Sequence, residues 1–164
     1  MAERRKPGLS HLDESGAARM VDVGEKKVTA REARAAAVVT MKPETLGQVT
    51  EGAVPKGDVF STARLAGIMA AKRTPELIPL CHPLRLDSIG IQFEVDREQS
   101  TITVESHVRA TDRTGVEMEA LTAAGVAALT IYDMCKAVDR GIEVTRLRVI
   151  YKSGGKSGTW EPGS

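Results

Sequence analysis

The scarcity of aromatic side chains constrains the fold of this chain more than any other feature of its sequence. The 164 residues include one Trp, two Tyr and two Phe, against 20 alanines and 15 glycines. Aromatic side chains usually bring large buried areas to a core. A core built from Ala, Val, Ile and Leu instead has thin layers and closely approaching helices. We therefore expect the protomer to bury further surface against a second copy of itself, which favours an oligomer.

Length, charge and cysteine content indicate a single domain over 1–164 that can bury a core without disulfides or metal ions. The 23 Lys and Arg nearly balance the 22 Asp and Glu, which argues against a partner that is a nucleic acid or a membrane surface. The first residues lack the apolar run of a secretory signal, and the longest uncharged run, 120–132, is too short to span a bilayer. Cys81 and Cys135 form no CxxC pair. We expect a cytoplasmic protein with free thiols.

The first structured segment, 29–41, is ambiguous from residue propensity alone. Its alanines favour a helix, but it ends in Val38-Val39-Thr40 and its charged residues form no helical stripe. This pattern favours a strand. After it we expect helices over 43–51 and 58–73, a loop over 74–86, strands over 88–96 and 101–110, a helix over 114–138 and a strand over 142–152.

This order of elements predicts an α+β fold of the ferredoxin-like kind, an antiparallel sheet with helices packed on one face. Asp58 is expected to cap the second helix. Thr114 and Glu117 have the spacing of a capping box for the long helix. The N-terminal segment, about 1–18, and the Gly/Ser-rich tail, about 153–164, are expected to be flexible.

The loop that carries Cys81 and His82 is the first candidate site. Pro79 and Pro83 restrict the backbone on both sides, so His82 is held on a stiff frame where it could transfer protons or contact a phosphate. The alternative is an ordinary loop histidine that faces solvent or caps a helix. No set of His and Cys residues has the spacing of metal ligands, so we expect no metal site.

The long helix is the second candidate. Asp133 and Lys136 lie three residues apart on one face, although such a pair is often a surface ion pair of small energy. Glu117 and Glu119 at the other end could equally be surface residues. The 14 residues from Glu119 to Asp133 span about 21 Å of helix. A ligand that contacts both ends is therefore long, or it lies between two subunits that contribute one helix end each.

Two further segments could bind anions. Lys56 precedes a helix N-terminus, where backbone N–H groups and the helix dipole favour negative charge. The tail carries Lys152 and Lys156 among glycines, but it is no Walker A loop, because Ile150 stands where the motif needs glycine. The tail could close over phosphates as a nest, or it could be a solvated end. The cations that follow Lys56 make the central segment basic, which suits a polyanionic small molecule better than DNA; they are Arg64, Lys72, Arg73 and Arg85.

Six segments closely resemble the MoaC family of molybdenum cofactor biosynthesis, and the resemblance covers about 11–158. They are 20–23, 56–58, 70–74, 77–84, 114–122 and 127–138; the most distinctive strings are LIPLCHP, IYDMCKAV and TGVEMEALTA, the last of which extends one residue further to Ala123. The resemblance implies a ferredoxin-like fold, a hexamer of three dimers, and active sites at the dimer interface. It implies a lyase that converts 3′,8-cyclo-7,8-dihydroguanosine 5′-triphosphate to cyclic pyranopterin monophosphate with release of diphosphate.

The same resemblance implies roles for individual residues. It makes Asp133 and Lys136 the catalytic pair, with Lys56 and His82 as further catalytic candidates. The expected substrate-binding residues, including Lys156 from the tail, are Leu80, Cys81, His82, Met118, Glu119, Glu117, Arg31, Lys152 and Lys156. We expect no cofactor, because the reaction needs proton transfers and phosphate chemistry but no redox step, although Mg²⁺ can accompany the triphosphate.

A ferredoxin-like binding module is the alternative from another class. An RNA-binding sheet needs aromatic stacking residues, and Phe93 is the only aromatic residue on the two expected hairpin strands. A nucleotide sensor without turnover is harder to separate from an enzyme by sequence. Release of diphosphate from the cyclised nucleotide would distinguish the two.

Overall fold

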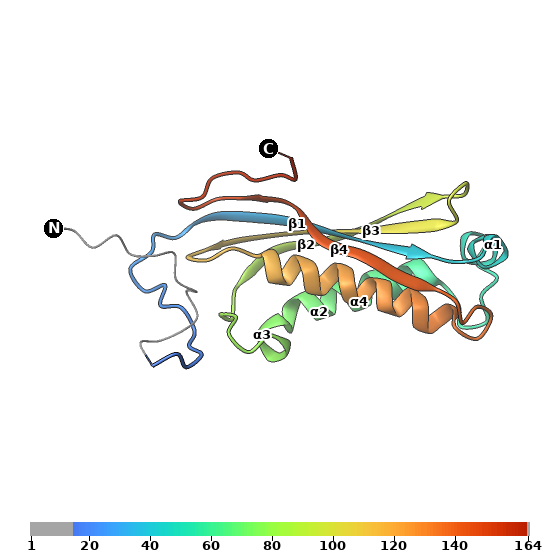
Figure 1. Ribbon diagram of the computed structural model, residues 1–164, viewed down its shortest axis with the longest axis horizontal. Coiled ribbons are helices and arrows are strands. Elements are labelled where there is room, and N and C mark those ends of the chain that lie inside the picture. Colours follow the sequence, from blue (N-terminus) through green and yellow to red (C-terminus); the bar gives the residue numbers. More distant parts are fainter. Residues whose placement is uncertain (1–14, 164) are drawn as a thin grey trace.

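The computed structural model describes residues 15–163, in which four long strands form one sheet and two long helices run along a single face of it (Figure 1). The elements are β1 Thr29–Thr40, α1 Pro43–Glu51, α2 Val59–Lys72, α3 Thr74–Leu77, β2 Leu86–Asp96, β3 Thr101–Asp112, α4 Glu117–Cys135 and β4 Glu143–Ser153. Most of the N-terminal segment for which we expected flexibility, residues 1–14, lies outside the described part of the chain.

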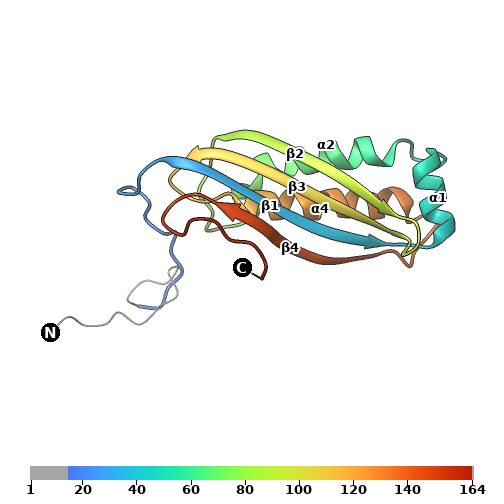
Figure 2. The same ribbon diagram turned by 90° about the horizontal axis from the view of Figure 1, so that it is seen from above.

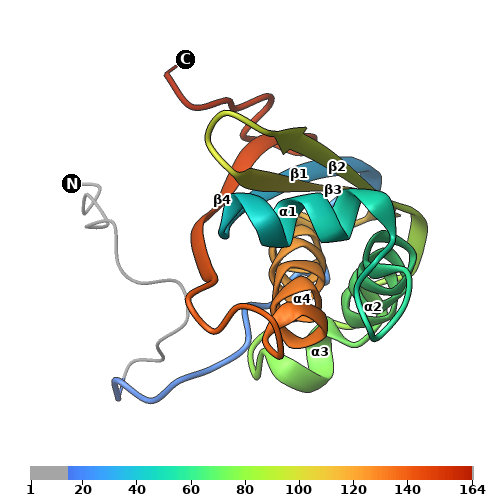
Figure 3. The same cartoon turned by 90° about the vertical axis from the view of Figure 1, so that its right-hand side faces the viewer.

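The strand order is β2-β3-β1-β4, and every neighbouring pair is antiparallel. The β1–α2–β2 connection therefore crosses over β3, and the β3–α4–β4 connection crosses over β1. Figure 2 shows the sheet lying over α2 and α4, with the strands reaching beyond these helices at the end away from α1, and Figure 3 shows α1 across the other end. Two interlocked βαβ units with all helices on one side are the ferredoxin-like arrangement, so the predicted α+β fold is confirmed.

The ambiguous first segment is a strand, as its pattern favoured. Along β1 the residues Ala33, Ala35, Ala37 and Val39 are completely buried beneath the helices, and the residues between them lie on the other face. This period of two is the alternation of a strand. β1 pairs with β3 and with β4, so it lies inside the sheet. The alanines that suggested a helix instead allow α4 to approach the sheet closely.

The two long helices also pack closely, because small residues face each other. A Cβ atom placed on Gly67 of α2 would lie 2.8 Å from the backbone oxygen of Ala123 in α4. Ala63 and Ala71 on α2 and Ala127 on α4 are also buried in this core. The core therefore has the thin layers that the shortage of aromatic residues predicts, and the Phe60 and Phe93 rings, 5.0 Å apart, lie at its edge.

The predicted start and end of the long helix are wrong. The helix begins at Glu117, and Val116 instead of Thr114 occupies its N-cap position. The capping box does not form, because the Glu117 carboxylate accepts a 2.8 Å bond from Lys152 Nζ. The helix ends at Cys135, three residues before the predicted end. In the loop that follows, the Asp139 carboxylate accepts a hydrogen bond from the backbone N–H of Lys42, directly before α1.

Two smaller differences concern loops. The segment 74–86 contains the short helix α3, in which Pro75 occupies the first turn and Thr74 Oγ1 donates to Ala71 O at 3.0 Å. Proline is tolerated in a first turn because its missing N–H has no helical partner there.

The C-terminal tail turns back on itself, since Trp160 and Lys152 exchange backbone hydrogen bonds of 2.9 and 3.0 Å.

Candidate active site

The candidate site residues form two groups at opposite ends of α4. We call one the Asp133 cluster; it consists of Lys56, Asp133 and Lys136. We call the other the Glu119 cluster; it consists of Leu80, Cys81, His82, Glu117, Met118 and Glu119. In Figure 1 the C-terminal end of α4 lies beside α1, and its N-terminal end lies at the far end of the sheet.

Three charged groups meet directly in the Asp133 cluster. Lys56 Nζ lies 2.9 Å from Asp133 Oδ2 and 2.8 Å from the Asp133 carbonyl oxygen, and Lys136 Nζ lies 2.6 Å from Asp133 Oδ1. The hydrogen bond from Lys136, followed by the one from Lys56, lowers the pKa of Asp133 to about 2. The same bond to Asp133 raises the pKa of Lys136. The carboxylate therefore keeps Lys136 charged.

This cluster is open to solvent and is built from two segments distant in sequence. The side chains of Lys56, Lys136 and Asp133 are 44%, 50% and 55% exposed. Asp133 comes from the last turn of α4, Lys136 occupies the C-cap position of that helix, and Lys56 comes from the loop between α1 and α2. The Asp133–Lys136 spacing predicted an ion pair, and it forms. The family resemblance had grouped Lys56 with this pair as a catalytic candidate, but no local spacing indicated that Lys56 would contact Asp133.

Glu119 is the buried group at the other end of α4. Only 3% of the residue is exposed, and burial raises the pKa of its carboxyl to about 7, with a smaller contribution from Glu117. A carboxyl with this pKa exchanges protons near neutral pH. The possibility that Glu119 is an ordinary surface residue of the helix is therefore wrong.

A cavity of about 670 Å³ lies beside Glu119 and is lined both by the loop that carries Cys81 and by the first turn of α4. Its lining includes Leu80, Cys81, His82, Met118 and Glu119. Burial raises the pKa of the Cys81 thiol, and the Glu119 carboxylate raises it further. A thiol in this state is mostly protonated at neutral pH and is a poor nucleophile.

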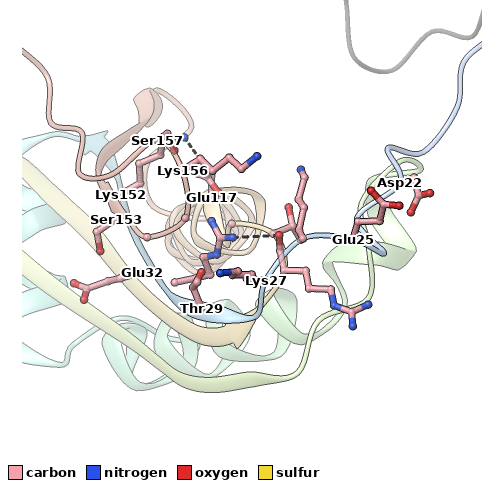
Figure 4. Close-up of a pocket in the computed structure, with 17 residues that line it drawn as sticks. Asp22, Glu25, Lys27, Thr29, Glu32, Glu117, Lys152, Ser153, Lys156 and Ser157 are labelled. Carbon is pink, nitrogen blue, oxygen red and sulfur yellow. Dashed lines mark hydrogen bonds and ion pairs between the residues drawn. The ribbon is translucent and has the colours of Figure 1, made fainter.

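A second cavity, of about 920 Å³, continues from the first and is lined by charged residues (Figure 4). Both cavities share Lys26, Thr114, Gly115 and Glu117. The predicted site residues Arg31, Glu117, Lys152 and Lys156 line the second one. Sequence reasoning missed three of its cations, Lys26, Lys27 and Arg113, because each lies in a segment without a recognisable site motif.

The end of β3 and the tail together fix the position of Arg31 at this cavity. Arg31 donates to the carbonyl oxygens of Asp112 and Arg113 at 3.3 and 3.2 Å. Gly154 and Gly155 pass over it with φ of +104° and +69°. A side chain on Gly155 would collide with the Arg31 guanidinium, so glycine is required there both for backbone conformation and for space.

The structure thus brings nine of the predicted residues together at one end of α4: Leu80, Cys81, His82, Met118, Glu119, Glu117, Arg31, Lys152 and Lys156. It places Lys56, Asp133 and Lys136 at the other end. The 19 residues of α4 separate the two groups within one chain.

Residues 15–163 hold no group of three His, Cys, Asp or Glu residues arranged to bind a metal ion. No helix within this part of the chain is long and apolar enough to cross a membrane.

By its fold the chain is a ferredoxin-like α+β protein with charged clusters at both ends of one helix. Residues 20–155 match the MoaC family. The chain is 62% identical over 154 residues to the cyclic pyranopterin monophosphate synthase of Pelotomaculum thermopropionicum, covering 94% of this chain and 91% of that one. It is 60% identical over 150 residues to the enzyme of the same name from Roseiflexus sp., covering 92% and 95% of the two chains. The chain therefore belongs to the MoaC family.

Proposed function

We propose that this chain is a cyclic pyranopterin monophosphate synthase of molybdenum cofactor biosynthesis. It converts 3′,8-cyclo-7,8-dihydroguanosine 5′-triphosphate to cyclic pyranopterin monophosphate and releases diphosphate. The observation that carries the proposal is the identity of about 60%, over more than nine-tenths of both chains, to relatives with that name. The two charged clusters and the adjoining cavities supply the side chains that this chemistry needs.

The Asp133 and Glu119 clusters together form one site, shared between two subunits of a dimer. They lie about 21 Å apart along α4 of a single chain, so one substrate cannot easily contact both. An antiparallel arrangement of two α4 helices would place the C-terminal end of one beside the N-terminal end of the other. The proposed assembly is a homohexamer of three such dimers, as the family resemblance implies.

Opening and rebuilding the purine-derived ring requires proton transfers between positioned groups. Lys136 and Lys56 donate protons, and Asp133 orients both. His82 and Glu119 exchange protons on the opposite side of the substrate, where Leu80, Cys81 and Met118 form the wall of the cavity.

Closing the cyclic phosphate concentrates negative charge on the α-phosphate and on the departing diphosphate. Arg31, Lys152 and Lys156 line the charged cavity and stabilise that charge, as preorganised cations do in phosphate chemistry. Glu117 holds Lys152 in position. No step is an oxidation or a reduction, so the proposed reaction uses no cofactor. Mg²⁺ enters only as a counter-ion of the triphosphate, and the enzyme works in the cytoplasm.

The direct test is to incubate the full-length protein with the cyclised nucleotide and to measure diphosphate release. We expect turnover by the wild type and almost none by Lys136→Ala. Arg97→Ala is the control, because it removes a cation from the exposed turn between β2 and β3, where Arg97 contacts Thr50. Saturable binding without diphosphate release would instead support the nucleotide sensor.

A further inference from the structure

Asp139 is a buried carboxylate in the loop after α4 that the proposed chemistry does not use. Only 2% of the residue is exposed. Its Oδ2 accepts bonds from Lys42 N at 2.9 Å and from Thr45 Oγ1 at 3.1 Å, and its Oδ1 accepts from Gly141 N at 3.0 Å. These bonds, the one from Lys42 N first, lower the pKa of Asp139. Asp139 is therefore a buried anion with hydrogen bonds on both oxygens.

Two of these bonds join segments that are far apart in the chain. Lys42 occupies the N-cap position of α1, and its side chain has no oxygen that could cap the helix. Asp139, in the loop after α4, instead accepts from the backbone N–H of Lys42 and from the hydroxyl of Thr45 in the first turn of α1. A carboxylate at a helix N-terminus also interacts favourably with the helix dipole. The start of α1 is thereby tied to the last turn of α4.

The same piece of chain carries Lys56. α1 ends at Glu51, and a short loop leads from it to Lys56 and then to α2. Val49, Val54 and Val59 around this loop are at most 4% exposed and belong to one core cluster with Met134 and Cys135 of α4. Because the loop is packed at both sides of Lys56, its position follows that of α1.

The exposed contact between Lys56 and Asp133 does not by itself hold this arrangement. Ion pairs between exposed side chains contribute little to stability. Buried hydrogen bonds to a charged group contribute more than such exposed ion pairs do. The bonds of Asp139 are buried or partly buried and therefore have the greater influence on where α1 lies relative to α4.

We propose that Asp139 is a positioning residue that holds Lys56 against Asp133 and Lys136 by tying the start of α1 to the end of α4. The proposal rests on the proposed function, in which Lys56 acts on the substrate. It assigns Asp139 no contact with the substrate.

The first test measures geometry and does not depend on activity. The pKa of the Asp133 carboxyl can be followed by ¹³C NMR of the full-length protein, with the signal assigned through Asp133→Asn. Withdrawal of Lys56 removes one of the bonds that keep this pKa low. We therefore expect the Asp133 pKa to rise in Lys56→Ala, and to rise in Asp139→Ala because Lys56 is displaced.

Two variants serve as matched controls. Asp139→Asn keeps one side-chain oxygen, which can still accept from Lys42 and Thr45, so we expect it to retain the low Asp133 pKa. Ile102→Val removes one buried methyl group from the same core and tests loss of stability alone, and we expect no change of the Asp133 pKa. If Asp139→Ala does not fold, Thr45→Val is measured in its place, because it removes one of the two hydrogen bonds that join Asp139 to the start of α1.

The second test is kinetic. A catalytic group displaced by about 1 Å can reduce turnover roughly 10²-fold. We expect Asp139→Ala to lower kcat by that amount with little change in KM. The double variant with Lys56→Ala should fall no further than Lys56→Ala alone, because residues that act through one another are not additive.

A folded Asp139→Ala protein, or Thr45→Val in its place, with an unchanged Asp133 pKa would overturn the proposal. The proposal would also be overturned if the fold-losses of kcat in Asp139→Ala and Lys56→Ala multiplied in the double variant. Absence of turnover by the wild type would overturn the proposed function, but the NMR result would still decide whether Asp139 positions Lys56.

Discussion

At the scale of single residues, the two ends of α4 hold carboxylates in opposite states. Asp133 is exposed and bonded to two ammonium groups, so its pKa falls to about 2. Glu119 is buried, and its pKa rises to about 7. The difference arises from environment alone, because hydrogen bonding to the charged form lowers a carboxyl pKa and desolvation raises it. If both act on one substrate, one carboxylate stays charged while the other can donate a proton.

The raised pKa of Glu119 predicts a pH-dependent stability. Below about pH 4.5 the carboxyl is protonated in both the folded and the unfolded protein, so it has no differential effect. As pH rises toward 7 the unfolded chain loses this proton while the folded chain retains it, and the folded state is destabilised relative to the unfolded one. A pKa shift of this size lowers the free energy of unfolding, once the pH is above 7, by an amount on the order of 3 kcal/mol.

We therefore expect the stability of Glu119→Gln, measured relative to the wild type, to increase as the pH is raised from 4.5 to 8. The measurement is urea unfolding of both proteins at the two pH values and one protein concentration. Because the substituted amide does not titrate, the difference between the two proteins isolates Glu119. A difference that does not change with pH would contradict the buried, neutral carboxyl described above.

At the scale of elements, the contact between α2 and α4 determines how closely the helices lie. Gly67 leaves no room for a side chain, since the neighbouring atom would be a backbone oxygen of α4, which cannot rotate away. Ile91 Cδ1 at 3.0 Å and Ala127 Cβ at 3.2 Å close the remaining space. This close contact compensates for the small side chains of the core.

Gly67→Ala should lower the free energy of unfolding by about 1–3 kcal/mol, because overpacking forces the helices apart. Gly47→Ala in α1 is the matched control, since no atom lies within 4 Å of the added Cβ. There alanine should stabilise the helix by up to about 1 kcal/mol through its higher helix propensity. Denaturant unfolding of both variants measures the two effects. If Gly67→Ala were stabilised as much as Gly47→Ala, α2 and α4 could move apart without loss of stability, which would contradict the close contact described above.

At the scale of the whole molecule, large apolar side chains remain exposed along the helices and on the edge strand. Leu65 and Met69 of α2, Leu129 of α4 and Leu147 of β4 are 46–59% exposed. Leu65 and Met69, four residues apart, share one face of α2, and exposed apolar patches are typical of surfaces that pack against other subunits. They support the proposed assembly, in which α4 of one chain contributes to the site of another.

Mixed assemblies test the shared site. In a mixture of Asp133→Asn and Glu119→Ala subunits, half of the dimers are mixed and one of the two sites in each is intact. Random pairing therefore regenerates roughly a quarter of the wild-type sites. A mixture of Asp133→Asn and Lys136→Ala is the control, because every site then carries a lesion in the same cluster. Diphosphate release measures recovery.

We expect activity in the first mixture and none in the control. Inactivity of both mixtures, with subunit exchange verified by native mass spectrometry, would mean that the two clusters act from the same chain. The two-subunit site would then be wrong.

What the sequence determined by itself is local. The strand-like ending Val38-Val39-Thr40, the proline and glycine boundaries and the Asp133–Lys136 spacing depend on residues close together in the chain, and together they predicted the ferredoxin-like order and an ion pair. The family resemblance, carried by LIPLCHP, TGVEMEALTA and IYDMCKAV, supplied the candidate site residues. Such features can be read from neighbouring residues because their geometry follows from helix and strand repeats.

Tertiary structure decided which distant groups meet. Thr114 and Glu117 have the spacing of a capping box, but β4 brings Lys152 to Glu117, and an ion pair replaces the cap. Lys56 reaches Asp133, and Asp139 reaches Lys42, only because α1 and the C-terminal end of α4 share one core cluster. Glu119 has a raised pKa because the loop that carries Cys81 helps to cover it. Each of these contacts joins residues more than 30 positions apart, and their distance depends on sheet register and helix packing, which no local pattern specifies.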